Sequence, residues 1–419
     1  MRNKRGSVLC LGLVAAMMPF ASSLQASSLT DHVCDVAVGH AQTQGLALQQ
    51  SAKRHVTGSV VDANGEPIIG ATINWSAAAD SATQSLVNRF WDVNKHYFVY
   101  NADQFENAPT NAYWPQAHAM DVIIDAYLRT GDKKYSDMFP LWYEGIKQQN
   151  SYDRNGYRNN FYDDSEWIGL TMVRLYEVTK EDKYLATAKD LMEWVKTAWN
   201  NIGGGGIAWE KNENLHSKNA CSNGPAALLA VRLYEVTKDA DYLEWSKKIY
   251  DWEKEHLFNP ATGAVYDALN GNTGELNKVT LSYNSGTFTG AAYHLFKVTG
   301  DETYLNDARK CANFAISDGS MIDTSNNIIR DEGNGDGGLF KGIFMRYFHQ
   351  LLDEPALSEV YRKKFTTFFN NNAEVLWRNG VNKNDLLFNS SWSTPVVGTT
   401  TLTSHVSGCT LLEMRASHE

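Results

Sequence analysis

Proline, cysteine and long apolar runs are all scarce in this sequence. Its 419 residues include only 9 prolines and 5 cysteines. Because proline breaks helices, its scarcity permits a chain made largely of helices. The cysteines are too few for a disulfide-built miniprotein, and they lack the CxxC spacing of zinc sites. The apolar run from Val8 to Phe20 is too short to cross a bilayer, so we expect no membrane span.

Positive charge is also in short supply. Lysine and arginine number 38 against 48 acidic residues, which gives a formal net charge of −10. Because the chain has no excess of basic residues, we do not expect it to bind nucleic acid. Aromatic residues are abundant instead, with 12 Trp, 20 Tyr and 17 Phe. Aromatic faces suit sugar rings, although most aromatic side chains in any protein belong to its core.

The first 28 residues have the organisation of a secretory signal peptide. A basic start at Arg2, Lys4 and Arg5 precedes the apolar run, and a stretch of small residues follows it. Such a segment is removed on export. We therefore predict an exported protein that acts in the periplasm, at the cell surface or as a secreted enzyme.

Residues 29–80 are predicted to be a linker. Residues 55–73 alternate like two short strands around the turn Asn64-Gly65. This stretch resembles the opening of a carboxypeptidase-regulatory-like β-sandwich, but it is too short to complete one. A lone hairpin is marginally stable at best. We interpret the segment as a truncated fragment with no function of its own.

From about residue 81 a pattern of two helices recurs. In four copies an apolar helix end is followed by a threonine, an acidic position and a tyrosine that opens the next helix. The copies are Thr130 to Tyr135, Thr179 to Tyr184, Thr237 to Tyr242 and Thr299 to Tyr304.

The two helices of a pair differ in their apolar faces. The helix before each turn is apolar nearly all round, whereas the helix after it has one apolar face, as at Tyr184, Ala188 and Leu191. An open solenoid would have a shorter and more regular repeat, roughly 34–47 residues. The alternation therefore predicts two concentric rings of helices, an all-α (α/α)6 toroid over residues 81–419.

Six aromatic, polar and glycine-rich stretches each precede an apolar helix. Since each lies at the entrance to an inner helix, all six are expected at one end of the toroid, around a central cleft. They are residues 111–118, 160–167, 203–209, 218–225, 283–286 and 333–342.

Asp163 and Asp164 are the candidate catalytic pair in these stretches. Glycoside hydrolysis needs two carboxyl groups, about 5–5.5 Å apart in retaining enzymes. Crowding and burial raise one pKa, so that one carboxyl stays protonated as the acid. The same two residues also suit a helix N-cap that stabilises the helix dipole. Spacing alone leaves both interpretations open.

The Asp163-Asp164 pair and five further motifs follow one another along the sequence. With these motifs the chain resembles the α-mannanases of glycoside hydrolase family 76 over about residues 81–380. The motifs are Tyr162-Asp163-Asp164 with Trp167, Gly205 to Trp209, Lys218-Asn219 with Asn223, Gly263 to Asp267, Tyr283 to Gly286, and Leu339 to Ile343. The tail after about Asn389 looks atypical.

The resemblance implies an (α/α)6 barrel and a retaining endo-α-1,6-mannanase. Asp163 would be the nucleophile and Asp164 the acid/base, and α-mannan or a mannooligosaccharide would be the substrate. Sugar subsites are expected around Trp114, Gln116, Trp167, Trp209, Asn219, Asp267, Tyr283 and Asn284. The three tryptophans suit the core as well as a sugar face. Asp267 would accept hydrogen bonds from mannose hydroxyls near the scissile bond.

Two other functions stay open at this stage. One is a transglycosylase that remodels wall glycans, and the other is a non-catalytic glycan-binding protein. We expect a monomer with no cofactor and no metal. The loop from Asp331 to Gly338 has glycines where a calcium loop requires ligands, and His118 is interpreted as structural.

Overall fold

A computed structural model describes residues 60–61, 67–68, 72–106, 108–211 and 215–419. The predicted signal peptide lies outside these residues. Val60–Val61 (β1) and Pro67–Ile68 (β2) pair as antiparallel strands, with Val60 opposite Ile68. This agrees with the predicted strand pair, while its resemblance to a β-sandwich opening stays a prediction.

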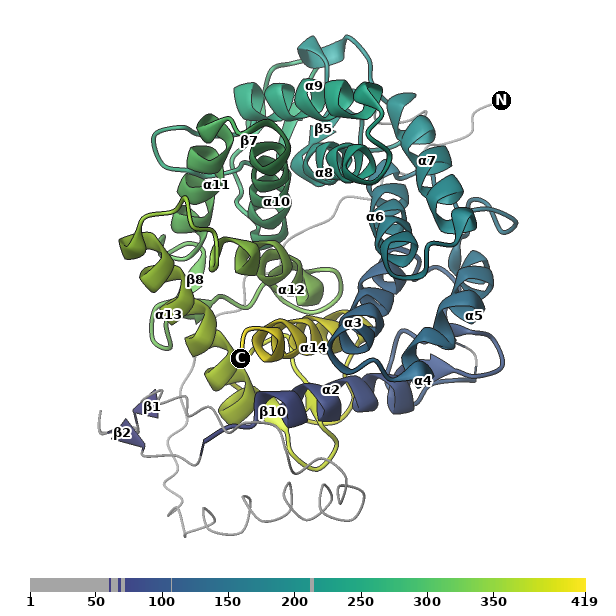
Figure 1. Ribbon diagram of the computed structural model, residues 1–419, viewed down its shortest axis with the longest axis vertical. Helices are drawn as coiled ribbons and strands as arrows, with labels where there is room; N and C mark the ends of the chain where they lie inside the picture. Colours follow the sequence, from purple (N-terminus) through teal and green to yellow (C-terminus); the bar gives the residue numbers. More distant parts are fainter. Residues whose placement is uncertain (1–59, 62–66, 69–71, 107, 212–214) are drawn as a thin grey trace, which may run out of the picture. The chain divides into compact units, whose positions relative to one another are not determined.

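The remaining described chain is mostly helical, and its inner helices form a closed ring (Figure 1). Each one packs against the next, and the last packs against the first. They are α3 (Trp114–Thr130), α6 (Tyr162–Thr179), α8 (Ala220–Thr237), α10 (Ser282–Thr299), α12 (Gly337–Phe348) and α14 (Leu402–Ser417). These helices are buried on nearly all sides, as their apolar sequences predict.

A second set of helices surrounds this ring. The outer helices are α2 (Trp75–Phe90), α4 (Lys133–Ser136), α5 (Met138–Gly145), α7 (Asp182–Lys196), α9 (Ala240–His256), α11 (Glu302–Ala315) and α13 (Glu359–Val375). Helix α7 packs on α6, α9 on α8 and α11 on α10. The first helix, α2, packs on the last, α14, which closes the toroid. The predicted (α/α)6 architecture is confirmed.

Short elements occupy the connections. The strands are β3 (Trp91–Asp92), β4 (Tyr97–Phe98), β5 (Ser217–Asn219), β6 (Ala268–Asn270), β7 (Leu276–Asn277), β8 (Ile322–Asp323), β9 (Ile328–Ile329), β10 (Val381–Asn382) and β11 (Leu387–Phe388). Strands β5, β6 and β7 form a three-stranded antiparallel sheet, and the others are hairpins. Single turns are η1 (Ile146–Gln149), η2 (Ile202–Gly204), η3 (His349–Leu351) and η4 (Leu376–Gly380).

The repeated threonine marks the end of four inner helices. Each of these helices ends at its threonine, whose hydroxyl donates to the carbonyl four residues earlier at 2.7 Å. The same hydroxyl accepts the N–H two residues later. The next residue adopts a left-handed conformation that reverses the chain into the outer helix. These residues are Gly131, Lys180, Lys238 and Gly300.

The toroid begins a little earlier than its predicted boundary. Helix α2 starts at Trp75, and the Asn74 side chain accepts a hydrogen bond from the N–H of Ala77. A boundary at residue 81 falls inside this helix. Trp75 is fully buried in the core, so the helical unit needs these residues. At the other end, α14 completes the inner ring, although its sequence looked atypical.

The N-termini of the inner helices lie at one end of the ring. Hydrogen bonds join four of these entries to neighbouring loops: the N–H of Tyr162 donates to Trp209, that of Ala220 to Asp267, and that of Leu402 to Tyr100. The Ser282 N–H donates to Glu332. These bonds join several of the predicted loops at this end of the ring.

A buried ion-pair network links three inner helices in their C-terminal halves. Asp125 of α3 pairs with Arg174 of α6 and with Arg346 of α12, at 2.8 Å for Arg346. Since α3 and α12 are not neighbours in the ring, this network crosses its interior.

Among the described residues, no helix is long and apolar enough to span a membrane. Cys221, Cys311 and Cys409 are buried free thiols.

Candidate active site

Asp163 and Asp164 lie in the first turn of α6, where that helix enters the ring. The N-cap position belongs to Phe161, so neither aspartate occupies it. The N–H of Tyr162 donates to the carbonyl of Trp209 at 3.1 Å, and the Tyr162 ring is buried against Trp194. These contacts fix the turn that carries the pair. Neither aspartate is thus the N-cap residue, although both lie in the first turn, where the helix dipole favours acidic side chains.

The two aspartates have different surroundings. Burial raises the pKa of Asp163 to about 7, while the Cys221 thiol and the N–H groups of Asp163 and Asp164 oppose the rise. Burial raises the pKa of Asp164 well above its usual value, and the negative charges of Asp163 and Asp336 add to the rise. Both carboxyl groups are thus harder to ionise than usual, and once one of them carries a charge, that charge holds the proton on its neighbour. One ionised and one protonated carboxyl are what a nucleophile and an acid need.

Asp336, which the sequence did not single out, faces the pair from another wall of the ring. It lies directly before α12, and its negative charge contributes to the raised pKa of both Asp163 and Asp164. Its Oδ1 accepts a hydrogen bond from Nε1 of Trp114 at 3.1 Å. Asp336 thus connects the predicted Trp114 to the catalytic pair.

On the other side, Asp267, Tyr283 and Asn284 form one group with Cys221. Asn284 Nδ2 donates to Asp267 Oδ1 at 3.3 Å. The Cys221 thiol lies close enough to the Tyr283 hydroxyl and to the Asp163 carboxyl to influence the pKa of both groups. Burial raises the pKa of Asp267, although hydrogen bonds from Asn284 and Asn277 oppose the rise. Three of the predicted site residues thus gather beside the pair.

Two oxygen atoms in this group are buried without a hydrogen-bond partner among the described residues. They are Oδ1 of Asp163 and Oδ1 of Asn284. A buried polar atom without a partner is costly. Water or a hydroxyl-rich ligand would satisfy both atoms.

The predicted tryptophans divide into two kinds. Trp167 is 2% exposed and lies against His118 and Trp114, with ring centroids 4.9 and 6.4 Å away. Its place is the core, where it supports Trp114. Burial lowers the pKa of His118 well below its usual value, so this histidine is neutral. Trp114 and Trp209 are only half-buried and keep surface for a ligand.

Gln116 has a structural role that the sequence did not reveal. Its side chain is fully buried, and its amide pairs with both backbone groups of Phe98 in β4. The same Nε2 also donates to the carbonyl of Ala112. The sequence predicts that Gln116 binds sugar, but its amide holds the β3–β4 hairpin to α3.

Asn219 ends β5 directly before α8, where it is half-buried. Its Oδ1 accepts a hydrogen bond from Ser217 Oγ at 2.7 Å. Tyr283 stacks on Phe340, with parallel rings 3.9 Å apart. One face of Tyr283 is therefore covered.

The glycine run at residues 203–206 packs against tryptophans. A Cβ on Gly206 would lie 2.7 Å from the Trp252 ring, and one on Gly205 would lie 2.6 Å from Trp199. The carbonyl of Gly206 accepts a hydrogen bond from the buried Lys218 ammonium at 2.8 Å. These contacts seat the loop that leads to Trp209.

A ring of paired helices that carries two unlike carboxyl groups at its mouth is typical of a glycoside hydrolase. The chain belongs to glycosyl hydrolase family 76, whose family model matches residues 74–419. The match confirms the resemblance and extends it beyond residues 81–380 at both ends.

Solved structures show the same fold. The α-1,6-mannanase of Salegentibacter sp. HEL1_6 is 38% identical, and its match covers 83% of this chain and 100% of that chain with a TM-score of 0.77. That protein was solved as an inactive variant, with two consecutive aspartates replaced by asparagine, in complex with α-1,6-mannotriose. A protein of Listeria innocua is 31% identical over 83% of this chain and 98% of that chain, with a TM-score of 0.73.

Among curated relatives, the mannan endo-1,6-α-mannosidase of Eremothecium gossypii is 25% identical over 260 residues. The match covers 56% of each protein. The chain thus spans little more than half the length of that relative.

Proposed function

We propose that the protein is a retaining endo-α-1,6-mannanase that cuts the backbone of α-1,6-mannan. The observation that carries this proposal is the pair Asp163 and Asp164 in the first turn of α6, two adjacent buried carboxyl groups whose pKa values burial raises. Membership of family 76 supports it. So do the α-1,6-mannotriose and α-1,6-mannotetraose complexes of the Salegentibacter enzyme.

In the first step, the ionised Asp163 attacks the anomeric carbon of a mannosyl unit. A bond forms between its carboxylate oxygen and that carbon, and the glycosidic carbon–oxygen bond breaks. Asp164 gives its proton to the departing oxygen, so the leaving chain ends in a hydroxyl group. The mannosyl unit stays covalently attached to Asp163.

In the second step, water attacks the same carbon from the side that the leaving group vacated. Asp164 takes a proton from this water, and the bond to Asp163 breaks. The negative charge of Asp163 raises the pKa of Asp164 before the reaction. Esterification of Asp163 removes that charge. The pKa of Asp164 then falls, which suits its change from acid to base.

The residues around the pair suit a neutral sugar chain. Asp267 and Asn284 offer hydrogen-bonding groups on one side, and Trp114 offers a half-exposed indole on the other. Hydroxyl groups of mannose can pair with the former, while a sugar face can stack on the latter. Because no ion pair forms with a neutral ligand, binding should depend little on salt.

The signal-like residues 1–28 also lead us to infer that the enzyme is exported and meets its polymer in the periplasm or at the cell surface. We infer that it acts as a monomer, because α6 alone supplies both carboxyl groups that the reaction needs.

The decisive experiment incubates the protein with linear α-1,6-mannan and resolves the products by size and by anomer. Endo action should produce internal fragments of several lengths at early times. Retention should give the α-anomer first, as seen by NMR before mutarotation. Failure to cleave the polymer would overturn the activity, and β-anomeric products would overturn the mechanism. Products longer than the substrate would indicate a transglycosylase instead.

A further inference from the structure

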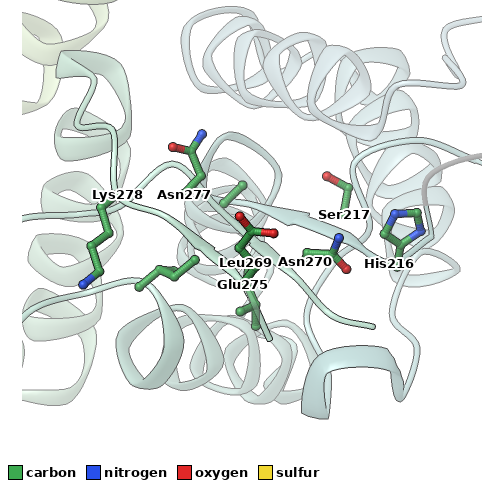
Figure 2. A pocket seen from close by; sticks show the side chains of 9 residues that line it. His216, Ser217, Leu269, Asn270, Glu275, Asn277 and Lys278 are labelled. Atoms are coloured by element: carbon green, nitrogen blue, oxygen red, sulfur yellow. The ribbon is translucent and has the colours of Figure 1, made fainter. Parts of the chain in front are cut away.

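A cavity of about 370 Å³ lies on the sheet formed by β5, β6 and β7. Figure 2 shows Ser217, Asn270 and Asn277 on this sheet, with His216 near one end and Lys278 near the other. Cavities of this size are common among small-molecule sites. The lining is mostly polar, and its charged members include one acidic side chain, Glu275, and one basic side chain, Lys278.

The strand register determines which side chains share the polar face. Asn219, Ala268 and Asn277 lie opposite one another across the three strands, and Ser217 lies opposite Asn270. Side chains alternate between the faces of a strand. These five residues therefore lie on one face.

The other face of the sheet is turned into the protein. Lys218, Leu269 and Leu276 lie opposite one another on this face, and Lys218 and Leu269 are buried, although both leucines also contribute apolar atoms to the cavity lining. The sheet is thus fixed from behind, while its polar face stays accessible.

Two hydrogen bonds join this face to the candidate active site. Ser217 Oγ donates to Asn219 Oδ1 at 2.7 Å, and Asn277 Nδ2 donates to Asp267 Oδ2 at 2.9 Å. Ser217 and Asn277 line the cavity, whereas Asn219 and Asp267 are predicted site residues. Residues that line the cavity are therefore in direct contact with predicted residues of the site.

We propose that this cavity is a distal subsite, which binds a neutral mannosyl unit of the polymer beyond the units next to the scissile bond. The inference rests on the proposed mannanase function. Ala268 presents only a methyl group between Asn219 and Asn277, so the middle of the polar face is open. One carboxylate and one ammonium leave the lining without an excess of charge. Uncharged hydroxyl groups suit such a surface better than an anion does.

The test compares the kcat/KM for linear α-1,6-mannan with the kcat/KM for α-1,6-mannotetraose. A distal subsite favours the longer substrate. The double variant His216→Ala/Glu275→Ala removes two polar lining groups, and the ratio should fall about five- to tenfold. Ala268→Leu fills the cavity and should lower the ratio in the same direction. The two designs are independent, so a folding defect in one leaves the other informative.

Asn272→Ala is the matched control, because Asn272 lies in the same β6–β7 turn but does not line the cavity. It should keep the wild-type ratio and the wild-type activity. If wild type cleaves both substrates and the variants keep its ratio, the distal subsite is wrong while the mannanase proposal stands. If wild type cleaves neither substrate, the proposed function fails, and the subsite fails with it.

Discussion

The indole N–H of Trp114 donates a hydrogen bond to Oδ1 of Asp336 across 3.1 Å. The two residues are 222 positions apart in the sequence, because Trp114 opens α3 and Asp336 precedes α12. Their contact fixes a carboxylate near Asp163 and Asp164, where its charge contributes to the pKa of both. Asp336 thus raises the pKa of both candidate catalytic residues and holds Trp114, a candidate sugar-binding residue, in place.

Asp336→Asn should move both limbs of the kcat/KM–pH profile to lower pH. The negative charge of Asp336 raises the pKa of Asp163 and that of Asp164, so its removal lowers both. The asparagine oxygen can still accept the hydrogen bond from Trp114. The variant therefore removes the negative charge but keeps this contact.

Asp331→Asn is the control for this change, since Asp331 lies in the same loop and contacts Ser390 and Lys341 instead. A full profile of initial rates on α-1,6-mannan measures the effect. If both variants keep the wild-type limbs, Asp336 has no electrostatic role in catalysis.

Asp163→Asn and Asp164→Asn should each lower kcat at least about 10³-fold on α-1,6-mannan, because each removes a different chemical role. The Asp164 variant should recover partly on a substrate with a good leaving group, which needs less protonation. The Asp163 variant should not recover. Circular dichroism should show an unchanged helical fold for both. Near-normal activity of either variant on the polymer would contradict the assignment.

The sequence predicted the features that depend on local signals. The four turns could be located because a threonine hydroxyl, a left-handed residue and an acidic N-cap act within a few residues, as at Thr237, Lys238 and Asp239. The Asp163-Asp164 pair was found because its two members are adjacent. Contacts such as Trp114 with Asp336 depend on ring closure, which no local pattern contains.

Gln116 is a residue for which the sequence suggests a functional role and the structure shows a structural one. Its position in an aromatic, polar loop suggests that it binds a sugar, but its amide is hydrogen-bonded to the backbone of the β3–β4 hairpin. An all-α interpretation does not anticipate that hairpin. Asp336 did leave a signal, since it lies in a glycine-rich stretch before an inner helix like the other site loops. That stretch is one of the six expected around the cleft, but the sequence pattern assigns no role to Asp336 itself.

Gly206→Ala should destabilise the protein and lower its activity. Gly206 has a φ of +81°, and a Cβ there would lie 2.7 Å from the Trp252 ring. The left-handed conformation costs an alanine roughly 1 kcal/mol, and the clash adds about 1–3 kcal/mol. Displacement of the loop should also disturb Trp209.

Gly204→Ala is a matched control for the clash. Gly204 has a similar φ of +75°, but a Cβ there comes no nearer than 3.5 Å to His256. Chemical denaturation of both variants should therefore separate backbone strain from overpacking. If both variants lose the same free energy of unfolding, the Trp252 ring moves away from the new Cβ at no energetic cost.

Two buried glutamates behind the catalytic pair should make stability depend on pH. Glu166 and Glu253 are fully buried, and none of their carboxyl oxygens has a hydrogen-bond partner among the described residues. Burial raises the pKa of Glu253 well above its usual value. Burial raises the pKa of Glu166 in the same way, and the charges of Asp163, Glu253 and Asp164 add to the rise.

A raised pKa means that the folded protein holds a proton which the unfolded chain releases above about pH 4.3. The contribution of Glu253 to stability therefore falls as pH rises from that value toward its folded pKa. Glu253→Gln cannot lose a proton, so its melting temperature should fall less steeply between pH 4 and pH 8 than that of wild type, by about a few degrees. Glu255→Gln, at an exposed position of the same helix α9, should follow wild type. If Glu253→Gln and wild type keep a constant difference in melting temperature across this range, Glu253 is not protonated in the folded protein at neutral pH.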